Sequence, residues 1–273
     1  MLSPAAHQVI ANYLSLPFPP PAGGLTGVTC PYFLNKGNKL HGGLRVLVGK
    51  GSPEDIVEEA TIVSLRDKLD VSGMTAEQMK KFLAENNIGI DCSGLIYYIL
   101  DAEAQARGKG QLKNILTYSS GLNPFRRLLI KLRPVENTNV KTFARDANSI
   151  PVDARNTQPG DIITMFGSGK EHDRDHMLLV HKVEETGQTF PSPQQSSGHA
   201  VPFTIHYTHS LAWRTDGRYH HGVRQGKIIV TDIKKPLVAQ RWIEQNKEGD
   251  ENETLERARY AEKLEIRRLK MLE

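Results

Sequence analysis

Apolar residues recur at helical spacing through the first half of the chain. The clearest run follows Cys92 and places apolar residues at positions i, i+1, i+4 and i+5, on one face of a helix: Leu95, Ile96, Ile99 and Leu100. Ser52 and Thr75 occupy capping positions that predict two earlier helices, the first running to about Lys68. Residues 4–15 have a weaker helical pattern. The sequence thus predicts a helical first half, with Cys92 at the start of a buried helix.

The pattern changes to short apolar segments after Pro159-Gly160. Four strands are predicted from their apolar and β-branched residues: residues 161–166, 177–183, 203–208 and 227–231. The polar stretch 185–200 is predicted to be a loop. Helices followed by an antiparallel sheet define an α+β domain.

Three segments are expected along the chain. Residues 1–50 are rich in proline and glycine and are predicted to form a loop-rich N-terminal extension. Residues 51–235 are predicted to be the main domain, with residues 108–155 as an insertion of mixed helix and loop. Residues 236–273 are predicted to be a charged helical tail, since the stretch after Gln240 carries 8 Lys/Arg and 9 Asp/Glu. Such a helix could bind a protein partner.

Composition narrows the class of protein. The chain has 273 residues, 38% of them hydrophobic, which is enough for a sizeable core. A net charge of +4 without clustered Lys, Arg and aromatic residues argues against nucleic-acid binding. The small basic patch at Arg126-Arg127 and Lys131-Arg133 is interpreted as a solvated helix face. No signal peptide and no membrane-spanning stretch is predicted. This leaves the cytoplasm or export by another route open.

Cys30 and Cys92 are the only two cysteines. One disulfide could join them, and two thiols alone do not make a metal site. Cys92 is the candidate nucleophile, because the N–H groups and dipole at a helix N-terminus stabilise a thiolate. Asp91 is placed to cap that helix, and the small residues Ser93 and Gly94 would let a substrate backbone approach. The simpler interpretation is that Cys92 is a buried apolar side chain.

Three motifs in order resemble the NlpC-type, papain-like cysteine peptidases. Residues 91–96, DCSGLI, are similar to the family's D-C-S-G-[LF]-[VI] motif, which carries the nucleophile. Residues 159–161, PGD, are similar to the Pro-Gly-Asp before the family's first core strand. Residues 175–180, DHMLLV, are similar to the segment in which a histidine starts the second strand. The resemblance covers about residues 88–232 and implies the papain-like fold.

The resemblance also implies roles for single residues. Cys92 would be the nucleophile, His176 its base, and a histidine on the next strand the third member. His209 fits that place because a small residue follows it, and His206 is the alternative, since residues three apart on a strand face opposite sides. Tyr32, in a Pro-Tyr pair, is similar to the tyrosine whose hydroxyl assists at the oxyanion. Asp91, Ser93 and Gly94 would lie against the substrate.

The chain departs from the family pattern in three ways. Cys92 and His176 are 84 positions apart, so residues 108–155 must be an insertion. Leu178 replaces the glycine usual after the histidine and its neighbour. Tyr32 lies 60 positions before Cys92, which requires a second insertion between them.

Other candidate sites fail on spacing. His172 and His176 are four apart in a segment rich in metal-ligand residue types, but this segment lies between two predicted strands and lacks H-E-x-x-H. Residues 49–52, GKGS, do not match the phosphate-loop pattern G-x-x-x-x-G-K-[ST]. His220-His221 is interpreted as an exposed turn. No metal and no cofactor is therefore expected.

The function implied by the resemblance is hydrolysis of an amide bond through a thioester acyl-enzyme. The expected substrate is a peptidoglycan stem peptide, cut between a D-residue and a diamino acid. One alternative is an acyltransferase or deamidase, because the same acyl-enzyme serves both reactions. Another is a non-catalytic module that binds a partner.

Overall fold

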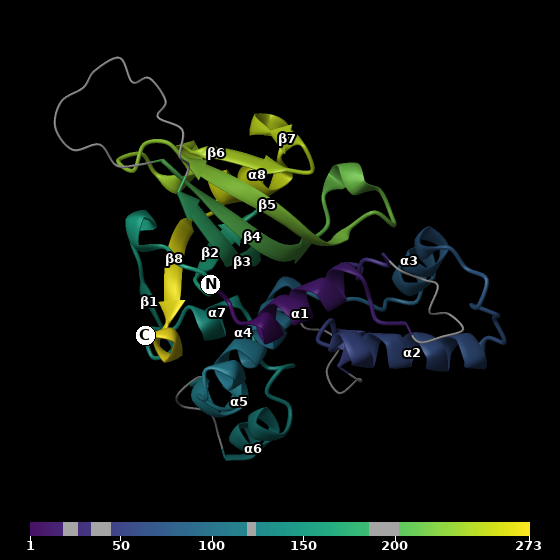
Figure 1. The fold of residues 1–273 in the computed structure, drawn as a ribbon. Coiled ribbons are helices and arrows are strands. Elements are labelled where there is room, and N and C mark those ends of the chain that lie inside the picture. The colour runs from purple at the N-terminus through teal and green to yellow at the C-terminus, as the bar shows by residue number, and fades with distance from the viewer. Residues whose placement is uncertain (19–26, 34–44, 119–123, 186–201) are drawn as a thin grey trace. The chain divides into compact units, whose positions relative to one another are not determined.

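The computed structural model describes residues 1–18, 27–33, 45–118, 124–185 and 202–273 (Figure 1). The chain divides into two compact units. One, here called the helical unit, comprises residues 3–148 and 209–224; the other, the sheet unit, comprises residues 1–2, 149–208 and 225–273. The predicted loop 185–200 lies, apart from its first residue, outside the described residues.

The helical unit contains seven described α-helices: α1 (Pro4–Leu14), α2 (Pro53–Arg66), α3 (Ala76–Glu85), α4 (Cys92–Ala106), α5 (Leu112–Ile115), α6 (Pro124–Leu132) and α7 (Val140–Phe143). The predicted helix starts are confirmed. Ser52 and Thr75 each cap their helix in a reciprocal capping box, with Asp55 and Gln78 as partners.

Helix α4 lies at the centre of the helical unit, packed against α1 and α5. The apolar face predicted for it is buried: Leu95, Ile96, Ile99 and Leu100 have no exposed surface. This burial fixes the helix along its length, and so fixes the position of its first residue, Cys92.

The sheet unit is built from a sheet of eight described strands in the order β1-β8-β2-β3-β4-β5-β6-β7. Their bounds are β1 (Ser149–Pro151), β2 (Ile162–Ser168), β3 (Arg174–Glu185), β4 (Phe203–Leu211), β5 (Gly222–Val230), β6 (Arg241–Glu244), β7 (Lys247–Glu248) and β8 (Lys263–Leu269). The division between the units falls within β4 and β5. The four predicted strands are confirmed as β2 to β5, and the chain is an α+β protein.

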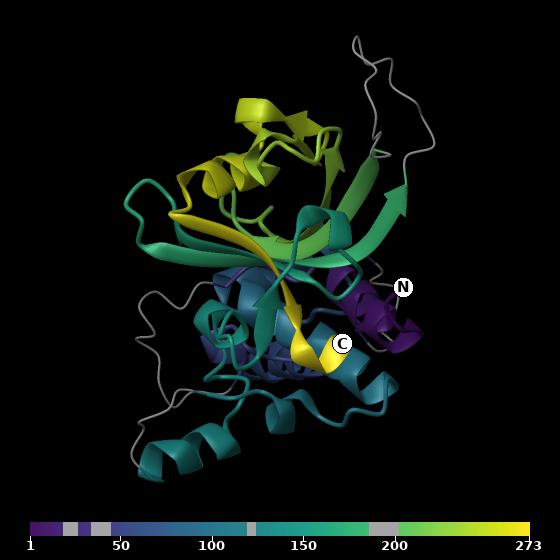
Figure 2. The same cartoon turned by 90° about the vertical axis from the view of Figure 1, so that its left-hand side faces the viewer.

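One face of the sheet holds an apolar cluster, here called the sheet core. Helix α8 (Glu253–Tyr260) covers this face (Figure 2) and adds Leu255 and Ala258 to the cluster. The strands contribute alternate residues, since every second side chain points to the same face; on β2 and β3 these include Ile163, Met165, Leu178 and Val180.

The predicted helical tail 236–273 is wrong. Only the eight residues of α8 are α-helical there, and β8 inserts between β1 and β2 in antiparallel register. Charged residues of β8 are accommodated by pairing. Arg267 is buried and donates from Nε to Ser149 Oγ at 2.9 Å and from Nη1 to Glu265 at 3.0 Å. The segment is therefore part of the sheet unit, and a partner for it stays a prediction.

The predicted segment boundaries also differ from the units. Residues 3–50 belong to the same unit as α4, and residues 51–235 are shared between the two units. Long-range contacts override the local change in composition on which the boundaries were based. No helix among the described residues has the length and apolar character needed to cross a bilayer.

Candidate active site

Cys92 is the first residue of α4, a helix of 15 residues. Asp91 precedes it in extended conformation and accepts the N–H of Gly94 at 2.6 Å, as an N-cap does. The thiol thus lies at the positive end of a capped helix, where the macrodipole favours a negative charge. The Cys92 residue is 7% exposed.

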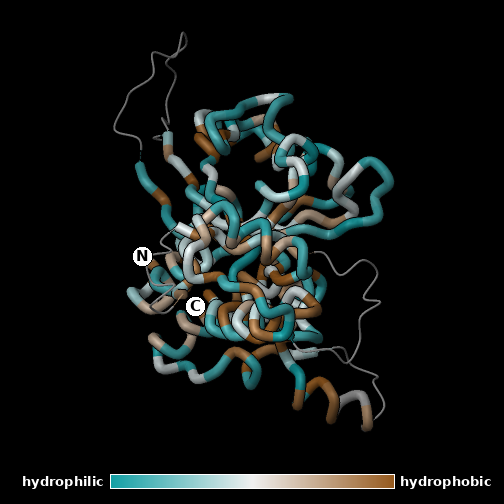
Figure 3. The backbone as a smooth tube through the Cα atoms, turned by 90° about the vertical axis from the view of Figure 1, so that its right-hand side faces the viewer, coloured by the Kyte–Doolittle hydropathy of each residue, from teal (hydrophilic) through white to brown (hydrophobic). Residues whose placement is uncertain are grey.

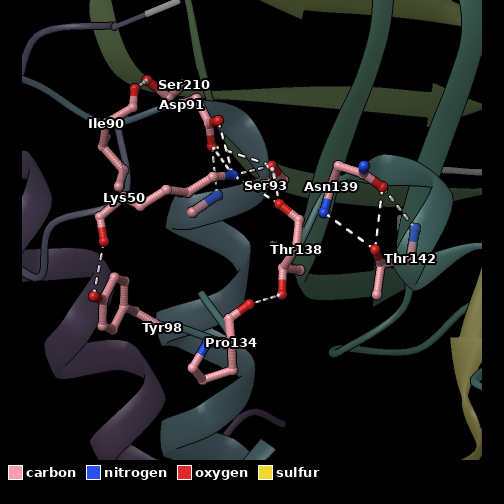
Figure 4. Close-up of polar contacts among 11 residues, drawn as sticks. Lys50, Ile90, Asp91, Ser93, Tyr98, Pro134, Thr138, Asn139, Thr142 and Ser210 are labelled. Atoms are coloured by element: carbon pink, nitrogen blue, oxygen red, sulfur yellow. Dashed lines mark hydrogen bonds and ion pairs between the residues drawn. The ribbon is translucent and has the colours of Figure 1, made fainter. Parts of the chain in front are cut away.

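A buried lysine holds the start of α4 in place (Figure 4). Lys50 Nζ lies 2.8 Å from both carboxylate oxygens of Asp91, and it donates to Ser93 Oγ at 2.5 Å and to the carbonyl oxygen of Thr138 at 2.9 Å. An ammonium has three donors, and all three meet an acceptor here. Thr138 belongs to the predicted insertion 108–155, so this segment contacts the residues around the start of α4.

The backbone carbonyl groups of Lys50 and of its two neighbours in sequence each accept a hydrogen bond. The carbonyl oxygen of Gly49 accepts the N–H of Asp91 at 3.0 Å, and that of Lys50 accepts the hydroxyl of Tyr98 at 2.8 Å. The carbonyl oxygen of Gly51 accepts the hydroxyl of Tyr13, also at 2.8 Å. The GKGS segment is therefore a structural support for α1, α2 and α4.

Position 94 requires glycine, because the Gly49-Lys50 segment and Ile90 leave no room for a Cβ there. A Cβ at position 94 would lie 2.8 Å from Ile90 Cδ1 and 2.9 Å from the Gly49 carbonyl oxygen, which is closer than real contacts. Asp91, Ser93 and Gly94 thus each have a structural task at the helix start. Substrate contacts by these three residues, and the nucleophilic role of Cys92, stay predictions.

Two distant segments meet the residues that lead into α4. Ile90 N–H donates to Pro31 at 2.9 Å, and its carbonyl accepts from Phe33 N–H at 3.2 Å and from Ser210 Oγ at 2.8 Å. Tyr32 and Ile90 form a parallel bridge. The structure therefore brings the Tyr32 segment beside the approach to Cys92 despite the 60 intervening positions. The oxyanion role of the Tyr32 hydroxyl stays a prediction.

His221 lies next to this segment and is not an exposed turn residue. It is half-buried, and its Nδ1 accepts the N–H of Tyr32 at 3.0 Å. Burial and the nearby Lys80 charge lower the pKa of His221. An acceptor Nδ1 carries no proton, so the neutral ring with its proton on Nε2 is the form that fits. Its neighbour His220 is exposed, as expected for a turn.

Cys30 is not placed to be a nucleophile. It is fully buried, its sulfur lies 3.6 Å from the Pro31 carbonyl oxygen, and burial raises its pKa. Both cysteines are free thiols, so the disulfide considered from the sequence is absent.

His176 belongs to the sheet unit and is 1% exposed. It lies opposite Met165 in the β2–β3 register, and Met165 is a member of the sheet core. Directly paired residues share a face. His176 therefore projects from the face that also carries Leu178 and Val180. Cys92 and His176 lie in different units, and their pairing stays a prediction.

The two histidines considered as third member differ in orientation. His206 Nε2 lies 2.8 Å from Glu184 at a partly exposed position, and its ring lies 6.1 Å from that of His181. His206 alternates with the core residues Ile205 and Tyr207, so it points away from the face of His176. Buried His209 alternates with Ser210, whose hydroxyl faces Ile90, so His209 projects from the opposite side of β4.

His181 was not singled out from the sequence. Its Nδ1 lies 2.9 Å from Thr208 Oγ1, which accepts from Gln225 Nε2 at 3.1 Å. The Thr208 hydroxyl therefore fixes the orientation of the His181 ring, and Gln225 fixes the hydroxyl. A base in catalysis needs such an orienting partner. His181 follows Val180 of the sheet core, so alternation places it on the opposite face of the sheet, with Thr208. No local pattern indicates this contact, because Thr208 and Gln225 lie on two other strands.

Comparison with known proteins gives no relative. No protein-family profile, no curated protein and no solved structure matches this chain. Within the described part of the chain, no group of three or more His, Cys, Asp or Glu side chains could hold a metal ion.

Proposed function

We propose that this protein is a cysteine hydrolase of papain-like, NlpC type that cleaves an amide bond through a thioester. The observation that carries the proposal is the place of Cys92: a thiol at the capped N-terminus of a buried helix, beside a segment held by Lys50. Such a thiol is activated by the helix dipole, whereas the only other cysteine is deactivated by burial.

In the proposed reaction, the Cys92 sulfur attacks the carbonyl carbon while His176 takes the thiol proton. His176 returns this proton to the amine as the C–N bond breaks, leaving a thioester on the sulfur. Water then adds to the thioester, which yields a carboxylic acid and restores the thiol. His209 orients the imidazole, and backbone N–H groups at Cys92, with the Tyr32 hydroxyl, stabilise the oxyanion.

The proposed substrate class is a peptidoglycan stem peptide. Incubation with purified muropeptides and mass spectrometry of the products tests it. We expect cleaved fragments with the wild type and with Cys30→Ser, and none above background with Cys92→Ala. Since Cys92 lies at a helix start that Asp91 caps independently of the thiol, both variants should keep the wild-type circular dichroism. Turnover retained in Cys92→Ala would refute the nucleophile.

The base is tested separately from the nucleophile. We expect His176→Ala to abolish turnover, and the matched change His181→Ala, at the oriented histidine on the same strand, to retain it. The reverse pattern would reject His176 as base while leaving Cys92 in place. A product that carries a new amine or ester in place of the carboxylic acid would identify the acyltransferase alternative, and release of ammonia from glutamine the deamidase.

A further inference from the structure

Helix α6 exposes an apolar face that nothing in the described chain covers. Its apolar residues Phe125, Leu128, Leu129 and Leu132 recur at i, i+3, i+4 and i+7, and each is between 41% and 70% exposed. At about 100° per residue they span an arc of roughly 100° on the helix. Figure 3 shows α6 as an apolar helix at the lower edge, projecting from the rest of the helical unit.

The opposite side of α6 attaches it to its unit. Ile130 is buried at 8% exposure, while its neighbours in sequence, Leu129 and Lys131, are exposed. The helix therefore does not hide its longer apolar face in the core, as amphipathic helices of globular proteins do. It presents that face outward. Most of the basic patch predicted from the sequence belongs to this same helix.

Charge identifies the kind of partner. The helix PFRRLLIKL carries three basic residues, Arg126, Arg127 and Lys131, and no acidic one, and residues 119–133 contain no Asp or Glu. Apolar residues beside an excess of basic residues are typical of helices that lie in the interface of an anionic membrane. A second copy of this chain would instead bring two basic helices together.

Helix α2 provides a contrast within the same unit. It also exposes apolar side chains, Ile62 at 50% and Leu65 at 73%. Its sequence PEDIVEEATIVSLR carries four acidic residues and one basic residue, however, so its charge opposes an anionic surface. Exposed apolar area alone is therefore not the distinguishing feature of α6.

We propose that α6 attaches the protein to the surface of anionic bilayers, lying parallel to the membrane with its four exposed apolar residues at the headgroup boundary. The attachment is peripheral, since nine residues are far too short to span the hydrocarbon core. This inference is independent of the proposed enzymatic function and holds whether or not Cys92 is a nucleophile.

Co-sedimentation of the full chain with vesicles tests the proposal. We expect binding to vesicles of phosphatidylglycerol and phosphatidylcholine, and little binding to vesicles of phosphatidylcholine alone. Leu128→Glu/Leu132→Glu should weaken binding by at least about tenfold, because two apolar anchors are lost and two negative charges face the lipid. The matched control Ile62→Glu/Leu65→Glu, at equally exposed positions of α2, should bind as the wild type does.

Salt and self-association complete the test. Binding should fall between about 0.1 M and 1 M NaCl, where the screening length shortens from roughly 10 to 3 Å. Absence of binding to the anionic vesicles, or equal binding by the α6 double variant, would overturn the proposal. So would a dimer in sedimentation equilibrium that Leu128→Glu/Leu132→Glu dissociates, since the face would then be covered by a second copy.

Discussion

The two cysteines of this chain lie in the same unit and illustrate how backbone environment changes a thiol. Cys30 is in an extended segment, with its carbonyl accepting Val223 N–H at 3.0 Å, and its fully buried sulfur is near a carbonyl oxygen. Cys92 is at the start of a capped helix. Burial raises the pKa of Cys30 although the Lys80 charge and a backbone hydrogen bond from Ile90 oppose it, whereas the N–H groups at a helix start favour a thiolate. Cys30 is fully buried and Cys92 is 7% exposed, so burial suppresses the Cys30 thiolate while the helix start favours that of Cys92.

A different backbone segment packs closely beside each cysteine. At Cys92 the support is the Gly49-Lys50 segment, which holds Asp91 and fits against Gly94. At Cys30 it is Gly222, where a Cβ would lie 2.2 Å from the Cys30 carbonyl oxygen. The first support contains a buried charge and the second is neutral, which makes the two regions separable by substitution.

The largest effect on stability is expected from Lys50→Met. This change leaves the Asp91 carboxylate without its ion pair and leaves Thr138 and Ser93 without their donor, which should lower the free energy of unfolding by about 3–5 kcal/mol. The matched control Lys263→Met, at an exposed ion pair with Glu265, should lower it by less than about 1 kcal/mol. Urea denaturation measures both. Equal losses would show that the Lys50 network does not anchor α4.

Adding one methyl group to each region compares their tolerance. Gly222→Ala meets backbone and requires φ near +142°, which disfavours alanine, whereas the Gly94 contacts include the end of the Ile90 side chain. We expect both to lose about 1–3 kcal/mol, with Gly222→Ala the larger loss. Thermal unfolding of the two variants side by side gives the order. The reverse order would place the tighter packing at Cys92.

The helices were predictable because the signals that mark them are local in sequence. Capping residues and apolar spacing lie within a few positions of each other, so Ser52, Thr75 and Asp91 marked three helix starts correctly. The strand β8 was not predicted, because its many charged residues are typical of a solvated helix. Its buried Arg267 is satisfied by Ser149, 118 positions away, and no local pattern encodes that partner.

Of the candidate site, only the part that depends on neighbouring residues was predictable. The position of Cys92 follows from its neighbours, but Lys50 meets Asp91 from 41 positions away, and the Tyr32 segment reaches Ile90 through tertiary structure. His181 contacts Thr208, which lies 27 positions away on the next strand. This is why His181 could not be found from the sequence.

The smallest effect concerns pH and the region of Cys30. The lowered pKa of His221 means that the unfolded chain binds a proton more readily than the folded one, so stability falls as pH drops below about 6.5. His221→Gln removes this titration and keeps an acceptor for Tyr32 N–H, so its stability should fall less between pH 6.5 and 5 than that of the wild type. The exposed neighbour serves as control: His220→Gln should match the wild-type slope in urea titrations at each pH.

Alkylation of each thiol alone tests the central comparison most directly. Iodoacetamide at pH 7 is added to folded Cys30→Ser, which retains Cys92, and to folded Cys92→Ser, which retains Cys30, and mass spectrometry follows the rates. We predict that Cys92 reacts at least about tenfold faster than free cysteine and that Cys30 does not react measurably, since its raised pKa keeps it a buried thiol. In 8 M urea the two rates should become equal. A Cys92 rate no higher than that of free cysteine would contradict the activation of this thiol by the start of α4.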